Sequence, residues 1–349
     1  MAISESQRSP RASIALRPGP LVQAVGDNWR RAIWPVFLIA FGLLCAGLLI
    51  GPRVPAADAG YNCVGNVELQ RPFGFSLNCD SPEFMWLARE PSGLLHQKNS
   101  RQSRPGLILL AALIQAPLSL IAPADGPPSP VYQGLYDPEQ IARTFTQDRP
   151  AYIAYLLLNF AILLASFQVV WRTIEHRRPA RDGAAAIIVV ATGLLLVAND
   201  VTKAFVWSPH TQMFNILVPV LAVYATQRSV AGAFAQRGFA LGLGAAVGFG
   251  ITAYPVFAVI AACALPAAIL ALLREKSAAV RRRSLVNLAS FLALCAIPSV
   301  LWYAVVQSTA SYVFHAELEL RQVIWMKDAL DQGFGVLLAE WFDRLRQLV

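Results

Sequence analysis

Eight long apolar runs are the feature of this sequence that most restricts how the chain can fold. They cover residues 33–50, 106–122, 151–171, 184–198, 211–226, 238–253, 255–273 and 284–306. Runs of roughly 18 or more apolar residues are typical of helices that cross a membrane, because a helix satisfies its backbone hydrogen bonds internally. Charged residues make up only 14% of the chain, against about 25% in ordinary soluble domains. We therefore predict an all-α fold, a polytopic bundle of about seven or eight transmembrane helices.

Short basic segments between the runs indicate which ends of the helices face the cytoplasm. Arginines gather in three of these segments, 172–181, 227–237 and 274–283. Loops rich in Lys and Arg stay on the cytoplasmic side. If all three lie inside, the run 106–122 cannot cross fully, so we expect it, with Pro117, to lie along or dip into the outer leaflet. The alternative is a full crossing that leaves Arg177 and Arg178 outside.

This topology divides the chain into three parts. Residues 1–28 form a disordered cytoplasmic tail, and residues 29–306 form the transmembrane domain, including a large external loop, 52–149, with short interfacial helices. Residues 307–349 form an external amphipathic segment. We expect an integral protein of a bacterial inner (plasma) membrane, with its N-terminus in the cytoplasm and its functional site outside. Basic loops beside lipid headgroups account for the net charge of +8, so we expect no nucleic-acid partner.

The external loop contains two cysteines and several carboxylates. Cys63 and Cys79 are candidates for a disulfide, because the extracytoplasmic side is oxidising. Asp80, Glu83 and Asp200 carry the oxygen ligands that a divalent cation prefers, but no ligand spacing demands one. A divalent cation is compatible with the sequence, and we assign neither a cofactor nor a metal site.

The most polar stretch of the chain begins at Asp80, in the sequence Asp-Ser-Pro-Glu that precedes Phe84. One interpretation is purely structural: Asp80 caps a helix whose first turn contains Pro82, with Glu83 near the positive end of the helix dipole. The other is catalytic: Asp80, just above the membrane, takes a proton from an acceptor hydroxyl. We expect Phe84, Trp86 and Leu87 to embed this short helix in the membrane interface.

Glu83 and several cationic and polar residues elsewhere in the chain are the candidate substrate ligands. Arg101 and Arg104 precede an apolar run, where they either face lipid headgroups or bind a phosphate through their planar guanidinium groups. A second polar group connects two spans at the same face: Asn199, Asp200, Lys203, His210 and Gln212. Asp200 and Lys203 can simply pair on one helical turn, and Gln212 can hydrogen-bond within the bundle. A polar side chain in an apolar run is costly, so one that has no such partner is expected to serve the function of the protein.

The chain resembles the GT-C superfamily of polytopic membrane glycosyltransferases. The resemblance rests on a first span followed by a long external loop, on Asp80 before a short helix, and on the element Ser100–Gly106, which contains Arg101, Arg104 and Pro105. Such a family implies transfer of a sugar from a polyprenyl-phosphate donor to a glycan, lipid or protein acceptor. It also implies that Asp80 is the base and that Arg, Lys and His residues bind the donor phosphate. This chain departs from many members in having Ser81 and Pro82, rather than a second acid, after Asp80.

Two other functions fit the same residues. A transporter or flippase for a lipid-linked or anionic substrate would use the polar residues as a pathway, but it needs them at both leaflets. A non-catalytic membrane subunit of a glycan-assembly complex would use Asp80 only as a cap.

Overall fold

The computed structural model describes residues 20–50, 65–70, 73–77, 80–96, 100–121, 145–177, 183–199, 202, 205–310 and 324–346. Within these segments the protein is mostly helical. The long helices are α1 (Pro20–Leu48), α4 (Pro105–Ile121), α6 (Arg149–Arg177), α7 (Gly183–Val197), α9 (Phe214–Val230), α10 (Arg237–Ala253), α11 (Ala258–Arg274) and α12 (Ala278–Ala310). Each predicted apolar run overlaps one of these helices, so the helical prediction is confirmed. However, α1 begins at Pro20, well before the predicted start of the first run at residue 33, so residues 20–28, which were predicted to belong to a disordered tail, are helical.

Among the residues that the structure describes, three helices are long and apolar enough to cross a membrane. They cover Arg149–Glu175, Pro255–Arg274 and Ala278–Thr309. Four shorter apolar helices accompany them, at Ala32–Leu48, Pro105–Ile121, Ile187–Val197 and Arg237–Ala253. The number of spans and their orientation remain predictions.

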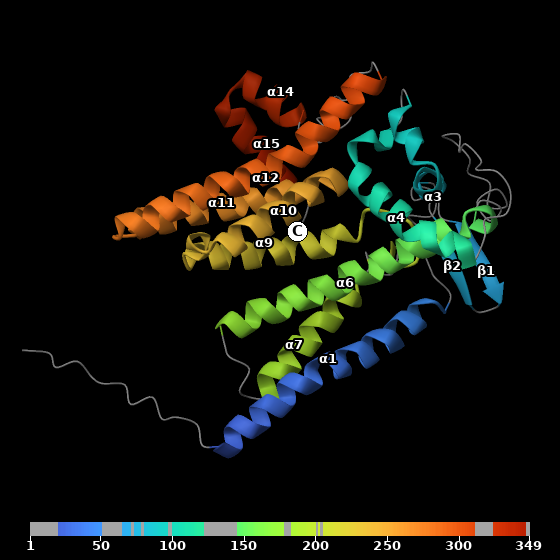
Figure 1. The fold of residues 1–349 in the computed structure, drawn as a ribbon, viewed down its shortest axis with the longest axis horizontal. Coiled ribbons are helices and arrows are strands. Elements are labelled where there is room, and N and C mark those ends of the chain that lie inside the picture. Colours follow the sequence, from blue (N-terminus) through green and yellow to red (C-terminus); the bar gives the residue numbers. More distant parts are fainter. Residues whose placement is uncertain are drawn as a thin grey trace, which may run out of the picture.

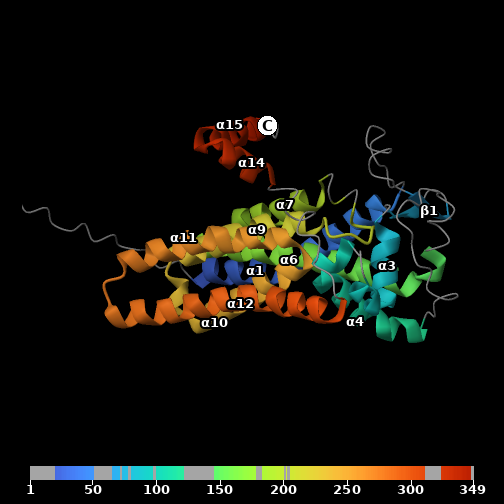
Figure 2. The same cartoon turned by 90° about the horizontal axis from the view of Figure 1, so that it is seen from above.

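The long helices lie side by side, and the smaller elements gather at one end of the bundle (Figures 1 and 2). That end holds α3 (Ser81–Arg89), α4 and an antiparallel hairpin of β1 (Gly65–Gln70) and β2 (Phe73–Leu77). The hairpin pairs Gly65 with Leu77 and Val67 with Phe75, and the all-α prediction did not include it. The α9–α10 and α11–α12 turns, which carry many of the arginines, lie at the opposite end (Figure 1).

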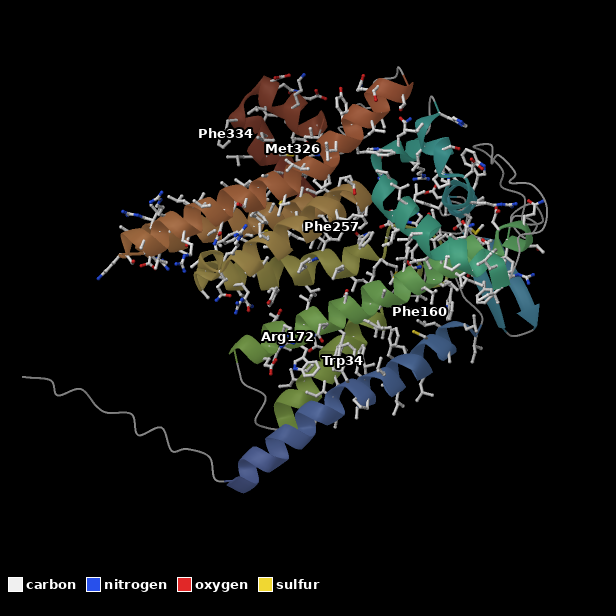
Figure 3. All side chains as sticks on the ribbon, viewed as in Figure 1. Trp34, Phe160, Arg172, Phe257, Met326 and Phe334 are labelled. Atoms are coloured by element: carbon white, nitrogen blue, oxygen red, sulfur yellow. The ribbon has the colours of Figure 1, made fainter. Side chains whose placement is uncertain are left out.

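Tight packing between helices supports this arrangement. A Cβ atom added at Gly248 of α10 would lie 2.1 Å from the carbonyl oxygen of Leu294 on α12, so only glycine allows the two backbones this close. Between α1 and α6, Trp34 packs edge-on against Phe167, with 5.1 Å between ring centroids (Figure 3). Phe167 also stacks on Phe37 of α1.

Two further helices follow the bundle. The segment predicted to be amphipathic contains α14 (Ile324–Gln332) and α15 (Phe334–Arg346), which pack on each other and stand apart from the bundle in Figure 2. Ala329 is buried, whereas Phe334, Trp341 and Phe342 are exposed. The amphipathic character of this segment and its place outside the membrane remain predictions.

Candidate functional site

The Asp80 carboxylate, at the start of α3, contacts residues outside its own helix. Pro82 lies in the first turn, where its missing N–H costs nothing. Asp80 occupies the N-cap position, but its side chain makes no capping hydrogen bond. Its two oxygens instead meet Arg101, at 2.5 Å, and Nε2 of His210, at 3.1 Å. The interpretation of Asp80 as a simple helix cap is therefore wrong.

Arg101 joins the two acidic residues of α3. Its Nη2 lies 2.5 Å from Asp80 and its Nε donates to Glu83 at 2.8 Å. The guanidinium carbon also lies 4.7 Å from the centre of the Phe84 ring, a cation–π distance. The Arg101 side chain is only 12% exposed and that of Asp80 is 39% exposed. Asp80 is therefore the charged group of this pair that an incoming molecule can reach.

The hydrogen bonds of His210 determine its tautomer. The backbone N–H of Gln212 donates to Nδ1 at 3.1 Å, so Nδ1 carries a lone pair rather than a proton. The proton of the neutral ring is then on Nε2, which donates to Asp80. Burial lowers the pKa of His210 below its usual 6.5, although Asp80 acts in the opposite direction. His210 is accordingly neutral at pH 7.

The environment of Asp80 keeps it ionised. Burial raises the pKa of this carboxyl, but the hydrogen bond from His210 and the positive charge of Arg101 outweigh burial. The pKa falls from 3.8 to about 2. Asp80 is thus an anion across the physiological pH range, and its carboxylate is partly exposed.

A polar chain extends the site from His210 to Arg104. The Gln212 side chain accepts a hydrogen bond from Asn215, and Asn215 Oδ1 accepts one from the Tyr254 hydroxyl at 2.9 Å. The Arg104 guanidinium lies 5.8 Å from the centre of the Tyr254 ring. The Gln212 side chain therefore bonds within its own segment, while Asn215 and Tyr254 join the start of α9 to the end of α10.

One face of α6 holds both halves of the site. The Tyr155 hydroxyl donates to the Phe84 carbonyl of α3 at 3.0 Å. The Asn159 amide donates to three carbonyls of the segment before His210, and Tyr152 donates to a fourth in the same segment. The acceptors of the Asn159 amide are the carbonyls of Phe205, Val206 and Ser208, at 3.0–3.1 Å. The acceptor of the Tyr152 hydroxyl is the carbonyl of Trp207. Because α6 anchors both elements, Asp80 and His210 meet in a defined geometry.

Two further contacts attach α3 to its surroundings. The hydroxyls of Ser81 and Ser208 lie 2.9 Å apart and link α3 directly to the segment before His210. At the other end of α3, Arg89 donates to the buried Asp148 at 2.9 Å. Burial raises the pKa of Asp148, and the ion pair with Arg89 opposes that rise without cancelling it.

The sequence did not identify these three α6 residues as part of the site. Tyr152, Tyr155 and Asn159 interrupt an apolar run at intervals of three and four residues, which places them on one helical face. A buried polar residue in such a run needs a hydrogen-bond partner. Three polar residues on one face of an apolar helix were therefore the sequence signal that could have identified them. The expectation that Phe84 and Leu87 embed α3 in lipid is wrong, because both are fully buried in the protein core.

Other predicted site residues lie apart from this cluster or outside the described residues. Asn199 bonds to the carbonyl of Leu196 and to Thr202, so it stabilises the turn that follows α7. Asp200, Lys203, Cys63 and Cys79 lie outside the described residues. The disulfide and the proposed contacts of Asp200 and Lys203 therefore remain predictions.

The cluster combines carboxylates with guanidinium groups and a neutral imidazole. Arg101 pairs with both Asp80 and Glu83, so its single positive charge offsets only part of the two negative charges. Among the described residues, no group of three His, Cys, Asp or Glu side chains has the placement to hold a metal ion. Asp80 accepts hydrogen bonds, and Arg104 supplies positive charge a short distance along the chain.

The fold and this cluster define a helix-rich protein with three helices that are long and apolar enough to cross a membrane, and a charged site at one end of its bundle. Comparison with family models, with curated proteins and with solved structures finds no match for the chain. The GT-C resemblance therefore remains a prediction from the residues quoted above.

Proposed function

We propose that this protein is a membrane glycosyltransferase that moves a sugar from a polyprenyl-phosphate donor to an extracytoplasmic glycan, lipid or protein acceptor. One observation carries the proposal: Asp80, at the N-cap position of α3, makes no side-chain capping hydrogen bond and is held as a partly exposed anion by Arg101 and His210. A residue needed only to begin α3 would bond the helix instead.

In the proposed reaction, Asp80 orients the acceptor hydroxyl and receives its proton. The acceptor oxygen forms a bond to the anomeric carbon while the bond from that carbon to the phosphate oxygen breaks. The phosphate departs with the bonding electrons. With a pKa of about 2, Asp80 is a weak base, so it takes the proton late, when the hydroxyl oxygen is already bonding to carbon. Attack opposite the leaving group inverts the anomeric centre.

The cationic residues take different roles in this proposal. Arg101 is already shared by Asp80 and Glu83, so it orients the base. Arg104, at the other end of the polar chain, stabilises the negative charge that grows on the leaving phosphate, an effect often worth about 3 kcal/mol. Because His210 is neutral with its proton on Nε2, it positions Asp80 without competing for the proton of the acceptor.

The decisive experiment replaces Asp80 with asparagine. Asp80→Asn keeps the shape of the side chain and removes its basicity, so sugar transfer from a panel of radiolabelled polyprenyl-phosphate sugars should fall by at least about 10²-fold. Glu90→Gln, at the exposed end of the same helix, is the matched control and should keep full activity. The assay uses the full chain in nanodiscs, alongside cell-envelope glycans from a deletion strain.

Full transfer by Asp80→Asn would remove the base assignment. Movement of a lipid-linked substrate between leaflets, without transfer in the wild type, would instead identify a transporter or flippase. If the wild type shows neither activity and glycan assembly still fails without the protein, a non-catalytic subunit is the better description.

A further inference from the structure

A basic patch lies at the end of the bundle opposite the charged cluster, where nitrogen-bearing side chains gather (Figure 3). Seven cations flank the α9–α10 and α11–α12 turns: Arg228, Arg237, Arg274, Lys276 and Arg281–Arg283. Within residues 228–237 and 274–283 the only acidic residue is Glu275. We call these seven cations the basic patch.

The two turns that carry the basic patch pack against each other. The Asn287 amide of α12 donates to the Phe234 carbonyl, in the α9–α10 turn, at 2.8 Å. A small cavity between the turns is lined by Ser229 from the first of them and by Leu272 and Ser284 from the helices that flank the second. The cations of both turns therefore lie at one surface of the protein.

The cations of the α11–α12 turn are available to a ligand. Arg274, Lys276 and Arg281–Arg283 are all exposed. The Glu275 carboxylate accepts a hydrogen bond from the backbone N–H of Ser277 at 2.8 Å. Within the part of the chain that the structure describes, no carboxylate forms an ion pair with a cation of the basic patch. Like charges this close repel one another, so a bound anion would stabilise them.

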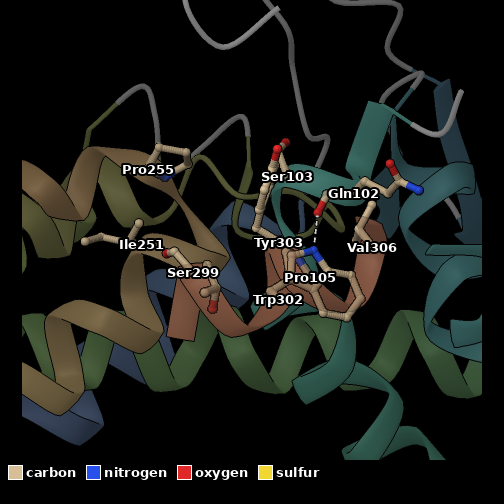
Figure 4. A pocket seen from close by; sticks show the side chains of 10 residues that line it. Gln102, Ser103, Pro105, Ile251, Pro255, Ser299, Trp302, Tyr303 and Val306 are labelled. Carbon is tan, nitrogen blue, oxygen red and sulfur yellow. Dashed lines mark hydrogen bonds between the residues drawn. The ribbon is translucent and has the colours of Figure 1, made fainter. Parts of the chain in front are cut away.

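The length of α12 places the arginine run at a membrane surface. Near the other end of this helix, the Trp302 indole N–H donates to the Gln102 carbonyl at 2.7 Å (Figure 4). Twenty residues separate Arg282 from Trp302 on α12, a rise of about 30 Å. The hydrocarbon core of a bilayer is also about 30 Å thick. If Trp302 lies near one surface of the membrane, Arg282 lies near the headgroups of the other.

An outward apolar face of α12 begins directly after the arginine run. Leu285 and Val286, about one turn beyond Arg282, are 53% and 60% exposed, and the face continues to Leu301. Exposed guanidinium groups followed by an exposed apolar face match a molecule with an anionic head and acyl chains. The surface of an acidic soluble protein would pair with the arginines but leave this apolar face uncovered.

We propose that the basic patch binds an anionic diacyl phospholipid, with the phosphate on Arg281–Arg283 and an acyl chain along the outward face of α12. The inference goes beyond the proposed function, because it concerns the opposite end of the bundle and needs no sugar transfer. It also goes beyond the positive-inside rule, which any cytoplasmic cation satisfies. A defined site should select the charge of the headgroup and should depend on particular arginines.

The test measures lipid binding by native mass spectrometry of the full chain in detergent micelles. Phosphatidylglycerol and phosphatidylcholine with identical acyl chains are titrated in turn, and phosphatidylglycerol should bind at least about ten-fold more tightly. A single Lys or Arg near an anionic surface contributes about five-fold in affinity, so Arg281→Gln with Arg282→Gln should weaken phosphatidylglycerol binding by about 25-fold. Binding of phosphatidylcholine should stay unchanged, because its headgroup has no net charge.

The matched control removes the same charge outside the basic patch. Arg149→Gln with Lys327→Gln changes two exposed cations, at the start of α6 and in α14, and should keep the wild-type affinity for phosphatidylglycerol. Equal affinities of the wild type for the two lipids would overturn the proposal. So would equal losses in the patch and control variants, which would show that only the total charge matters.

Two water-soluble anions distinguish the lipid from other sources of negative charge. Glycerophosphoglycerol has the headgroup of phosphatidylglycerol without its acyl chains, and polyglutamate represents an acidic protein. Neither should displace phosphatidylglycerol at the concentration of the lipid itself. Displacement by glycerophosphoglycerol would reduce the patch to a phosphate site, and displacement by polyglutamate would identify an acidic protein as the partner; either result overturns the proposal.

Discussion

Replacing Asn159 with leucine should show whether the hydrogen bonds that hold the segment before His210 are needed for function as well as for stability. The two amide protons of Asn159 are shared by three carbonyls, those of Phe205, Val206 and Ser208. Leucine is similar in shape and offers no proton, so the carbonyls lose their partner. Two lost hydrogen bonds at about 1 kcal/mol each, with a further penalty for a carbonyl left unsatisfied, give about 3 kcal/mol of destabilisation.

Asn287 is the matched control, since it is a buried asparagine on a long apolar helix with a single carbonyl partner. Its amide donates to the Phe234 carbonyl at 2.8 Å, in the turn between α9 and α10 at the opposite end of the bundle from α3. Asn287→Leu should cost about 1 kcal/mol. Reversible unfolding in mixed detergent, followed by circular dichroism, measures both values.

The two variants should also differ in function. Asn159 holds the segment that leads to His210, so its loss should free His210 from Asp80 and reduce sugar transfer, whereas Asn287→Leu should leave transfer intact. His210 would become more hydrated, and its pKa would rise from its lowered value toward 6.5, so protonation would begin at a higher pH in the transfer profile. The reasoning is refuted if both variants lose the same stability, or if Asn159→Leu transfers sugar with an unchanged pH profile.

Three further perturbations test the packing and the charges. Gly248→Leu should cost about 3 kcal/mol or prevent folding, because even its Cβ would lie 2.1 Å from the Leu294 carbonyl; thermal unfolding measures this, and wild-type stability would contradict the α10–α12 packing. Because the pKa of Asp80 is lowered to about 2, the stability it contributes is complete above about pH 4 and is lost as pH falls toward 2. Melting curves at pH 5 and pH 2.5 should therefore show a smaller acid-induced loss in Asp80→Asn than in the wild type; equal losses would argue against the ion pair. Arg89→Leu leaves Asp148 buried without its cation and should cost about 3 kcal/mol at pH 8. Its deficit should shrink at pH 5, because protonation of a carboxyl with a raised pKa relieves the buried charge, and a deficit independent of pH would refute this account.

The candidate site was partly predictable because some of its residues are polar residues in an otherwise apolar chain. Asp80, Glu83 and Arg101 form a dense polar stretch in an apolar chain, and His210 precedes an apolar run where a polar group is costly. All four meet in the structure. The sequence did not predict that Arg101 bridges Asp80 and Glu83, and its binding of phosphate remains a prediction.

The supporting residues were harder to predict because their partners are backbone carbonyls. A carbonyl is present at every residue, so no residue type marks Phe84, Trp207 or Ser208 as the acceptor for α6. Tyr152 and Tyr155 also resemble ordinary aromatic residues of an apolar helix. Their function depends on which segment the fold places beside them, and the hairpin of β1 and β2 was missed because it is short and lies in a loop.

The sequence by itself determined which segments are helical and apolar. Hydropathy and length are local properties that any stretch of about 20 residues displays. Only the tertiary structure decided that Asp80 meets His210, which is 130 residues further along the chain. It also decided that Asp80 bonds these partners rather than its own helix, because contacts between distant residues depend on how the helices pack and not on the composition of either segment.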